Sequence, residues 1–509
     1  MKDQGRLEAW IGRRNAEWPE ERCLWWNGAW WNRREFAGKV EAAARALSAG
    51  WFKAGERVAC FLPDCPTVLV LSAAAWTLGG TVVPLNMKAG TPAILKILRH
   101  VEPAGVFLHE SMTPLVETLA AEGIPAAATG LEGELPDLAL RRVTPESPDM
   151  AVVFATSGTT GDPKAVPLSH GNLLDNARRV HETIEGFETG RVLMNVLPNF
   201  HALGYTVCGL LPLLFGLHEV ILPSFIPIKN VFEALRATRT EVLIAVPTML
   251  PFLLGSVAKG EECPDSLKYI LTGGGRLDPT LDRRVRDTLG VVVFEGYGLT
   301  ETSPVVSANR SFAHKKIGTV GPVLPGYEFE VRDPDGRVLG RGEDGLLWVR
   351  GPSVFSGYFR SPEMTAERVA DGWFNTGDIV RVDADGYIEI LDRASDLIIV
   401  GGFNVYPQEI ETVLNEVPGV LMSAVIGIPN AVSGEVPKAF VIPREGADLS
   451  AQALIAYAKE NLSHYKVPRK VEFVTELPLS SVGKVLRREL RRLEKSQGRE
   501  SREVTLGRD

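Results

Sequence analysis

Cysteine is scarce in this sequence, and no pattern joins the few cysteines present. The five cysteines among 509 residues are scattered, odd in number, and none belongs to a C-x-x-C pair. Zinc fingers and disulfide-stapled secreted domains keep their cysteines in paired, closely spaced patterns. We therefore expect free thiols in a reducing compartment and neither a zinc site nor a disulfide framework.

The sequence also lacks an excess of positive charge and an apolar leader. The formal net charge is −8, which does not favour a nucleic-acid-binding protein. The first ten residues, "MKDQGRLEAW", contain none of the apolar run that a secretory signal needs. From these two absences we predict a cytoplasmic protein with no nucleic-acid partner.

No uninterrupted apolar run is suited to crossing a membrane. Residues 67–87 carry no charge, but Gly79 and Gly80 divide the run and Pro84 ends it, so we expect a buried helix followed by a buried strand. Residues 192–228 are broken by four prolines, two histidines and a glutamate. This second run is either the wall of an apolar pocket or plain core. We expect no transmembrane segment and leave peripheral membrane contact open.

Helical and strand patterns alternate along most of the chain. Residues 36–50 have helical spacing and end at a glycine, "ERVACFLP" then reads as a strand, and residues 91–101 and "AGVFL" repeat the order. This alternation is typical of an α/β fold with doubly wound, mostly parallel sheets. From residue 316 the sequence pattern favours β-strands, and "TVGPVLPGYEFEVRDPDG" and "GLLWVRGPSVFSGY" are predicted to form hairpins.

Four segments follow from these patterns. We predict a large N-terminal domain over 1–392, with a β-rich subdomain over about 316–392. A small mobile α+β domain follows over 393–493, and 494–509 form a polar tail.

One loop, "TSGTTGDPKAV" at residues 156–166, combines hydroxyls, glycines and a lysine. It is not a Walker A loop, because Lys164 follows Pro163 and precedes Ala165 instead of standing between a glycine and a Ser or Thr. Its backbone N–H groups and hydroxyls are still suited to phosphate oxygens. We expect the strand "MAVVFAT" before it and the helix "SHGNLLDNARRV" after it; a polar turn is the alternative reading.

Five further motifs follow in order. They are "PNFHALG" (198–204), "EGYGLTET" (295–302), "NTGDI" (375–379), "DRASDLIIVGGFNVYPQEIE" (392–411) and "PLSSVGKVLRREL" (478–490). With these motifs the chain resembles the adenylate-forming superfamily, which includes acyl-CoA synthetases, firefly luciferases and adenylation domains of peptide synthetases. The resemblance implies that a carboxylate attacks the α-phosphate of ATP, and that a thiol then takes the acyl group and releases AMP.

The resemblance also implies where the nucleotide lies. Phosphates would bind the loop after the first strand, adenine would stack on Tyr297, and the ribose would bind Asp378 and Arg393. The implied contacts are Thr156, Ser157, Gly158, Thr159, Thr160, Gly161, Lys164, Gly274, Gly275, Glu295, Gly296, Tyr297, Gly298, Asp378, Ile390 and Arg393.

Four residues are implied in the chemistry itself. Lys484 would stabilise the transition state of adenylation, because an ammonium group is a compact charge on a flexible stem. Thr300 would contact the α-phosphate, and His201 would position or gate the acid. Glu301, together with Thr156, would bind Mg²⁺, a cation that prefers oxygen ligands.

The small domain is implied to rotate between the two half-reactions. The family's pivot is usually Lys or Asp, and here it is Ser395. Gly401 and Gly402 would then border the thiol channel, while His201, Gly273 and Gly275 would border the acyl channel. For "TGGG" (272–275), tight structural packing is the alternative.

The expected substrates are ATP, coenzyme A and a carboxylic acid. The apolar run at 192–228 lacks the charge that an amino-acid substrate would need, which favours a medium- or long-chain fatty acid over an aryl acid. The acceptor is coenzyme A or an acyl carrier protein, and the basic cluster at 487–492 would suit either. A homodimer is left open, and nothing beyond the shared motifs favours a luciferase-like oxygenase.

Overall fold

The computed structural model describes residues 5–156, 164–430, 432–479 and 485–495, and of Thr156 the backbone alone. The chain divides into two compact units. The first comprises Met1–Phe329 and Val349–Phe374, and the second comprises Glu330–Trp348 and Asn375–Asp509. The domain boundaries predicted at 316 and 392 stay predictions.

The first unit contains two mostly parallel sheets. In the described residues, one sheet has the strand order β6-β5-β3-β4-β7-β8, and its parallel strands end in one antiparallel pair, β7 with β8. Its strands are β3 (Arg57–Phe61), β4 (Thr81–Pro84), β5 (Gly105–Leu108), β6 (Ala126–Ala128), β7 (Met150–Thr156) and β8 (Lys164–Ser169).

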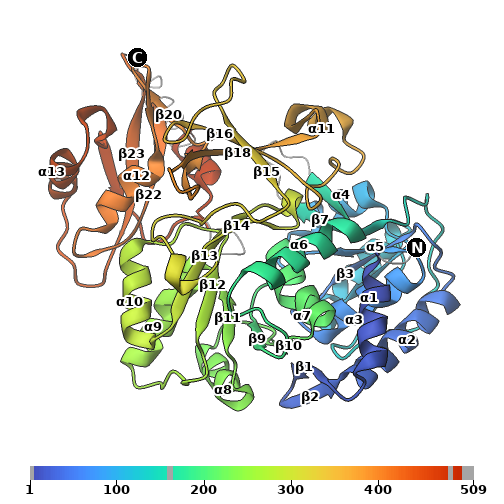
Figure 1. Ribbon diagram of the computed structural model, residues 1–509. Coiled ribbons are helices and arrows are strands. Elements are labelled where there is room, and N and C mark those ends of the chain that lie inside the picture. Colours follow the sequence, from blue (N-terminus) through green and yellow to red (C-terminus); the bar gives the residue numbers. More distant parts are fainter. Residues whose placement is uncertain (1–4, 157–163, 431, 480–484, 496–509) are drawn as a thin grey trace. The chain divides into compact units, whose positions relative to one another are not determined.

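The second sheet of this unit has the order β14-β13-β12-β11-β9-β10-β1-β2, with antiparallel pairs at its two edges. Its strands are β1 (Arg22–Trp26), β2 (Ala29–Asn32), β9 (Val192–Asn195), β10 (His218–Ile221), β11 (Val242–Ala245), β12 (Tyr269–Thr272), β13 (Val292–Gly298) and β14 (Val305–Ala308). Helices α9 (Leu250–Ala258) and α10 (Pro279–Leu289) pack against one another beside these strands (Figure 1).

Helices connect and cover the parallel strands, as a doubly wound fold requires. The predicted helix at 36–50 is α2, which begins after an Asn32 capping box and ends before Gly50. Residues 67–87 form the buried helix α3 and the strand β4, as predicted. Besides α9 and α10, the helices of the described first unit are α1 (Leu7–Glu17), α2 (Arg33–Ala49), α3 (Pro66–Thr77), α4 (Thr91–Val101), α5 (Pro114–Ala121), α6 (His170–Thr183), α7 (Leu211–Phe215), α8 (Ile228–Thr238) and α11 (Pro362–Arg368).

Short 3₁₀ and π-helical segments shape the connections. A π-helix, η2 (Leu203–Leu210), begins within the last two residues of the "PNFHALG" motif, and a 3₁₀ turn, η4 (Thr300–Thr302), lies inside "EGYGLTET". Other 3₁₀ turns are η1 (Glu110–Met112), η3 (Pro247–Met249), η5 (Phe312–His314) and η6 (His464–Lys466).

The β-rich part is a five-stranded sheet in the described residues, with the order β15-β16-β18-β17 and β19 added to β18. Only the first half of the predicted hairpin "GLLWVRGPSVFSGY" is a strand, so that prediction is wrong: after Arg350 the chain turns and its side chains pack into the first unit. The strands are β15 (Glu328–Arg332), β16 (Asp344–Arg350), β17 (Val369–Ala370), β18 (Trp373–Val382) and β19 (Ile388–Arg393).

The rest of the second unit is a small α+β body with a core of its own. The strand order is β21-β20-β23-β22, with β24 pairing β23 in parallel. The elements are β20 (Ile398–Val400), β21 (Phe403–Val405), α12 (Pro407–Asn415), β22 (Val420–Asn430), β23 (Gly434–Pro443), α13 (Ala451–Asn461) and β24 (Lys470–Phe473). The predicted fold class, a large domain of doubly wound sheets and a small α+β domain, is confirmed.

Candidate active site

The predicted phosphate loop connects two antiparallel strands. Residues 157–163 lie outside the described residues, but Thr156 at the end of β7 pairs with Lys164 at the start of β8. The predicted helix after the loop is α6, which begins at His170 after its N-cap Ser169, but the strand β8 that precedes it was not predicted. Pro167 is tolerated there because β8 is the edge strand of its sheet.

Glu301, the predicted magnesium ligand, lies in a buried turn beside Lys164. Its side chain is about nine-tenths buried, and the hydroxyl of Tyr358 donates a 2.8 Å hydrogen bond to its Oε1. The Lys164 ammonium lies 5.3 Å from the centre of the Tyr358 ring. Burial, and then the neighbouring Glu301, raise the pKa of Tyr358, so this phenol stays a hydrogen-bond donor. The structure thus gathers Lys164 and Glu301 around Tyr358.

The turn that carries Glu301 is fixed from three sides. The Asn176 side chain donates to the carbonyls of Thr302 and Val305, at 3.2 and 2.8 Å, and the Tyr327 hydroxyl donates to the Thr302 carbonyl at 2.7 Å. Ser303, with φ of 73°, donates its hydroxyl to the Ser353 carbonyl at 2.8 Å. Such buried bonds hold the carboxylate in place before any ligand arrives.

Sequence reasoning missed Tyr358, Asn176 and Tyr327. The sequence pattern predicts Tyr358 at the end of a hairpin. The other two carry no signal in a single sequence, since their partner Thr302 lies 126 positions from Asn176 and 25 positions from Tyr327.

The predicted glycines converge on one small region. A Cβ on Gly273 would lie 3.2 Å from the Gly296 carbonyl oxygen and 3.8 Å from Leu203 of the π-helix. A Cβ on Gly298 would lie 1.9 Å from the Pro304 carbonyl oxygen, so no side chain fits there. Gly274 and Gly275 follow in the same turn, where φ of Gly274 is +76°.

Glu295 and Tyr297 alternate with these glycines along β13. The Glu295 carboxyl accepts a 2.9 Å hydrogen bond from the Leu277 N–H, and burial raises its pKa to about 7. This bond ties the "TGGG" turn to β13. Tyr297 is half-buried and pairs with Ser307 of β14, and Thr300 is half-buried at the start of η4.

His201 lies just before the π-helix. Its ring centre is 4.7 Å from that of Phe200, its backbone N–H donates to the Pro198 carbonyl at 2.9 Å, and burial lowers its pKa to about 4. The imidazole is therefore uncharged at neutral pH. π-helices are rare in proteins, and those that do occur, like this one of eight residues, are often found at functional sites.

In the second unit, the predicted ribose ligands lie opposite one another. Asp378 of β18 and Arg393 of β19 are register partners, with Arg393 Nε 2.9 Å from Asp378 Oδ1. Asp378 is 2% exposed. Ile390, half-buried, stands opposite Val380 in the same ladder.

The predicted hinge and thiol-channel residues lie in exposed turns of the same unit. Ser395 lies between β19 and β20. Gly401 and Gly402 form the tip of the β20–β21 hairpin with φ of +58° and +88°, a conformation that glycine adopts without strain.

The predicted basic docking cluster at 487–492 is not one solvated surface. Arg487 is 9% exposed and binds Glu411 through two nitrogens, at 3.2 and 2.6 Å, while Arg491 binds Asp396 at 2.8 Å. Arg488 and Arg492 remain largely exposed. The docking interpretation is therefore wrong for Arg487 and Arg491, which hold the hinge-side segment instead.

Some predicted residues lie outside the described residues. These are Ser157, Gly158, Thr159, Thr160, Gly161 and Lys484, and for Thr156 the side chain.

The apolar run at 192–228 is largely core. Val192, Met194, Val220 and Phe225 belong to one buried cluster, each less than a tenth exposed. No helix of the described residues is long and apolar enough to cross a membrane, and they contain no cluster of three metal-ligating side chains.

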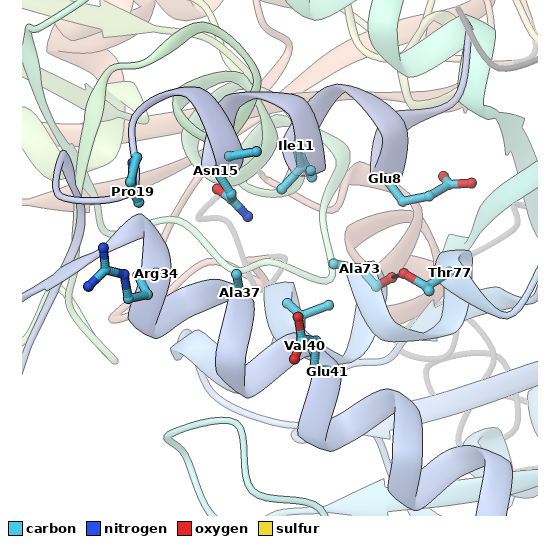
Figure 2. A pocket seen from close by; sticks show the side chains of 12 residues that line it. Glu8, Ile11, Asn15, Pro19, Arg34, Ala37, Val40, Glu41, Ala73 and Thr77 are labelled. Carbon is cyan, nitrogen blue, oxygen red and sulfur yellow. Dashed lines mark hydrogen bonds between the residues drawn. The ribbon is translucent and has the colours of Figure 1, made fainter.

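The described residues of the first unit include two cavities. One, of about 690 Å³, borders Tyr358 and is lined by β8, the start of α6 and residues 354–366. The other, of about 360 Å³, lies between α1, α2 and α3, with Glu8, Asn15, Arg34 and Glu41 around small apolar side chains (Figure 2). The second contains none of the motif residues.

Comparison with known proteins agrees with this geometry. The family model described as "AMP-binding enzyme" matches residues 11–359, and that described as "AMP-binding enzyme C-terminal domain" matches residues 409–484. A feruloyl-CoA synthase from Amycolatopsis sp is 36% identical over 97% of this chain and 99% of its own length. A long-chain-fatty-acid–CoA ligase from Bacillus subtilis is 30% identical over 88% and 87%, respectively.

Solved structures match over nearly the whole chain. ATP-bound MatB from Rhodopseudomonas palustris is 31% identical with a TM-score of 0.88, covering 96% of this chain and 99% of that one. The o-succinylbenzoate CoA synthetase from Bacillus subtilis, bound to its acyl-adenylate, is 29% identical with a TM-score of 0.83, covering 94% and 97%. The chain therefore belongs to the AMP-binding enzyme family of the adenylate-forming superfamily, as an AMP-forming acid–CoA ligase.

Proposed function

We propose that the acid activated by this ligase is an aryl carboxylic acid of the feruloyl type. The observation that carries the proposal is the 36% identity to a feruloyl-CoA synthase across almost the full length of both chains. The packing of the 192–228 run into the core supports it, because the fatty-acid prediction relied on that run as a tunnel wall. A fatty acid remains the second candidate, favoured by the long-chain-fatty-acid–CoA ligase relatives.

In the first half-reaction, a carboxylate oxygen of the acid attacks the α-phosphorus of ATP. The new O–P bond forms as the bond to the β-phosphate breaks, and pyrophosphate leaves. Residues 156–164 hold the departing phosphates, Tyr297 stacks on adenine, and Asp378 accepts hydrogen bonds from the ribose hydroxyls. Lys484 neutralises charge that develops on the oxygens.

Glu301 fits the role of a magnesium ligand. Mg²⁺ takes one or two protein carboxylates and completes its shell with phosphate and water oxygens. Glu301 supplies a buried carboxylate whose turn is already fixed and whose Oε1 is held by a neutral donor, Tyr358. When bound, the ion would neutralise charge on the leaving phosphates.

His201 serves as an uncharged positioning group for the acid. With a pKa near 4 the imidazole carries no charge at pH 7, so it orients the carboxylate through hydrogen bonding instead of trapping it in an ion pair. In the second half-reaction the coenzyme A thiolate attacks the acyl carbon, a C–S bond forms, and AMP leaves. Rotation at Ser395 and passage of the thiol past Gly401 and Gly402 belong to this proposal.

A substrate panel tests the proposal. Pyrophosphate release is measured with ferulic acid, benzoates, C4 to C18 fatty acids and amino acids, with and without coenzyme A, and Glu301→Gln sets the background. We expect kcat/KM for ferulic acid at least about tenfold above that for any fatty acid, a discrimination within reach of pocket contacts. A fatty acid preferred by the same margin would overturn the aryl assignment and leave the ligase class intact.

A further inference from the structure

The turn that precedes His201 is anchored at both ends by buried carboxyl side chains that no motif contains. Residues 195–199 connect β9 to the segment that carries His201 and the π-helix. Asp64, from the connection between β3 and α3, holds one end, and Glu219 of β10 holds the other. The two anchors therefore join both sheets of the first unit to this turn.

Asp64 makes the shorter of the two contacts. The backbone N–H of Asn199 donates to Asp64 Oδ1 at 2.6 Å. Asp64 is 6% exposed and Asn199 is 2% exposed, so water does not substitute for this acceptor. Removal of the carboxyl would leave a buried N–H without a partner, which a protein avoids by moving the backbone.

The other end is held through side-chain amides. Asn195 Nδ2 donates to Glu219 Oε1 at 3.0 Å and to Asn199 Oδ1 at 3.2 Å, and Asn195 Oδ1 accepts from the Leu197 N–H at 3.2 Å. Asn195 and Glu219 are fully buried. Asn199 Nδ2 and Glu219 Oε2 have no hydrogen-bond partner in the described part of the chain, so the turn depends on the few bonds that it does make.

A displacement of this turn would also displace the π-helix segment beside Gly273 and Gly296, where the predicted glycines converge. A Cβ on Gly204 would lie 2.6 Å from the Pro198 carbonyl oxygen and 2.7 Å from that of Leu197, so the start of the π-helix packs directly on the turn. Leu203, at the start of the π-helix, in turn lies beside Gly273, since a Cβ on Gly273 would be 3.8 Å from the Leu203 side chain. A shift at Asn199 would therefore move His201 and Leu203 against β12 and β13.

We propose that Asp64 is a positioning residue for the carboxylic acid substrate, acting through Asn199 on the segment 201–204. The inference rests on the proposed function, in which that segment borders the acid. Asp64 accepts from the turn that leads to this segment, so it sets the affinity for the acid and leaves ATP binding unchanged.

Three variants of the full-length enzyme test this role. Asp64→Ala removes the acceptor, Asp64→Asn keeps an oxygen that accepts from Asn199, and Glu56→Gln is the matched control. Glu56 is a buried carboxylate at the opposite end of β3, where it accepts from the Lys53 N–H at 2.8 Å. We expect Asp64→Ala to raise KM for the preferred acid at least about tenfold, with KM for ATP within twofold, and both other variants to stay within threefold of wild type.

Two outcomes would overturn the role of Asp64. One is a KM for the acid unchanged in Asp64→Ala; the other is an equal rise in KM for acid and ATP, as a merely structural residue would give. If Asp64→Ala does not fold, Asn195→Ala decides by the same comparison, because it removes the link between Asn199 and Glu219. Wild-type enzyme inactive on every acid would refute the proposed function, whereas an active wild type with unaffected variants would refute this inference alone.

Discussion

The two units hold the carboxylates in and around their candidate sites by different means. In the first unit, neutral donors do this: the Tyr358 hydroxyl for Glu301, the Leu277 N–H for Glu295 and the Asn199 N–H for Asp64. In the second unit, arginines do it: Arg393 for Asp378, and Arg487 for Glu411.

This difference determines which of these groups change their protonation state as the pH changes. A buried carboxyl held by neutral donors has its pKa raised by burial, as for Glu295 and Asp64. Burial alone would lower the pKa of Arg487, but Glu411, Asp392 and Asp396 raise it, so its charge is fixed. Glu295 and Asp64 of the first unit therefore take up protons more readily than free carboxyls do, whereas Arg487 of the second unit keeps its charge and depends on partners that must stay beside it.

The largest predicted effect separates the two half-reactions, because Lys484 of the second unit acts in only one of them. We expect Lys484→Ala to slow acyl-adenylate formation about 10³- to 10⁴-fold, the scale at which a lost cation affects phosphoryl transfer. Thioester formation from preformed adenylate should continue at nearly the wild-type rate. Pyrophosphate exchange and single-turnover thioester assays measure the two steps separately, and equal loss in both would contradict the role of Lys484.

How far could the sequence alone lead to this site? Motif order predicts Glu301, the glycines and the Asp378–Arg393 pair as site residues, because such residues are local to short strand–turn segments. It did not find Tyr358, Asn176 or Asp64, since each acts on a residue more than fifty positions away. Periodicity did not predict the strand β8, which can contain Pro167 because it lies at the edge of its sheet. It also did not show that the basic run at 487–492 is divided by ion pairs that only the tertiary fold creates.

The ion-pair network of the second unit should be costly to break. We expect Arg487→Met to lower the free energy of unfolding of this unit by about 3–5 kcal/mol, because Glu411 and Asp396 would be left without their buried partner. Arg492, 78% exposed, provides the control, and Arg492→Met should change stability by less than about 0.5 kcal/mol. Denaturant unfolding followed by fluorescence measures both. Similar losses of unfolding free energy in the two variants would contradict the idea that the second unit depends on its buried arginine–carboxylate pairs.

In the first unit, the matching change is Glu301→Gln. The amide still accepts from Tyr358, so the fold should be kept, but the negative charge for a cation is lost. We expect adenylation to fall about 10²-fold, with a higher magnesium concentration needed for half-maximal rate. Thermal unfolding should stay within a few degrees of wild type. A normal rate and magnesium dependence would show that Glu301 only completes its turn.

The most gradual predicted change concerns the pH response of the first unit. Burial, with a smaller contribution from nearby Asp64, raises the pKa of Glu219 from 4.5 to about 8, although Asn195 opposes the shift. The folded protein therefore keeps a proton that the unfolded chain loses near pH 4.5. The stability gained from this proton is complete below pH 4.5, decreases as pH rises, and is lost above pH 8.

Glu219→Gln removes this dependence because glutamine stays neutral and its oxygen still accepts from Asn195. We expect the free energy of unfolding of wild type, relative to that of Glu219→Gln, to fall by at most about 1.4 kcal/mol per pH unit between pH 5 and 8. Glu295 and Asp64 are present in both proteins, so their own titration largely cancels in the difference. Urea unfolding at pH 5, 6, 7 and 8 measures it. A difference independent of pH would mean that Glu219 is charged in the fold, and that the first unit holds its carboxylates no differently from the second.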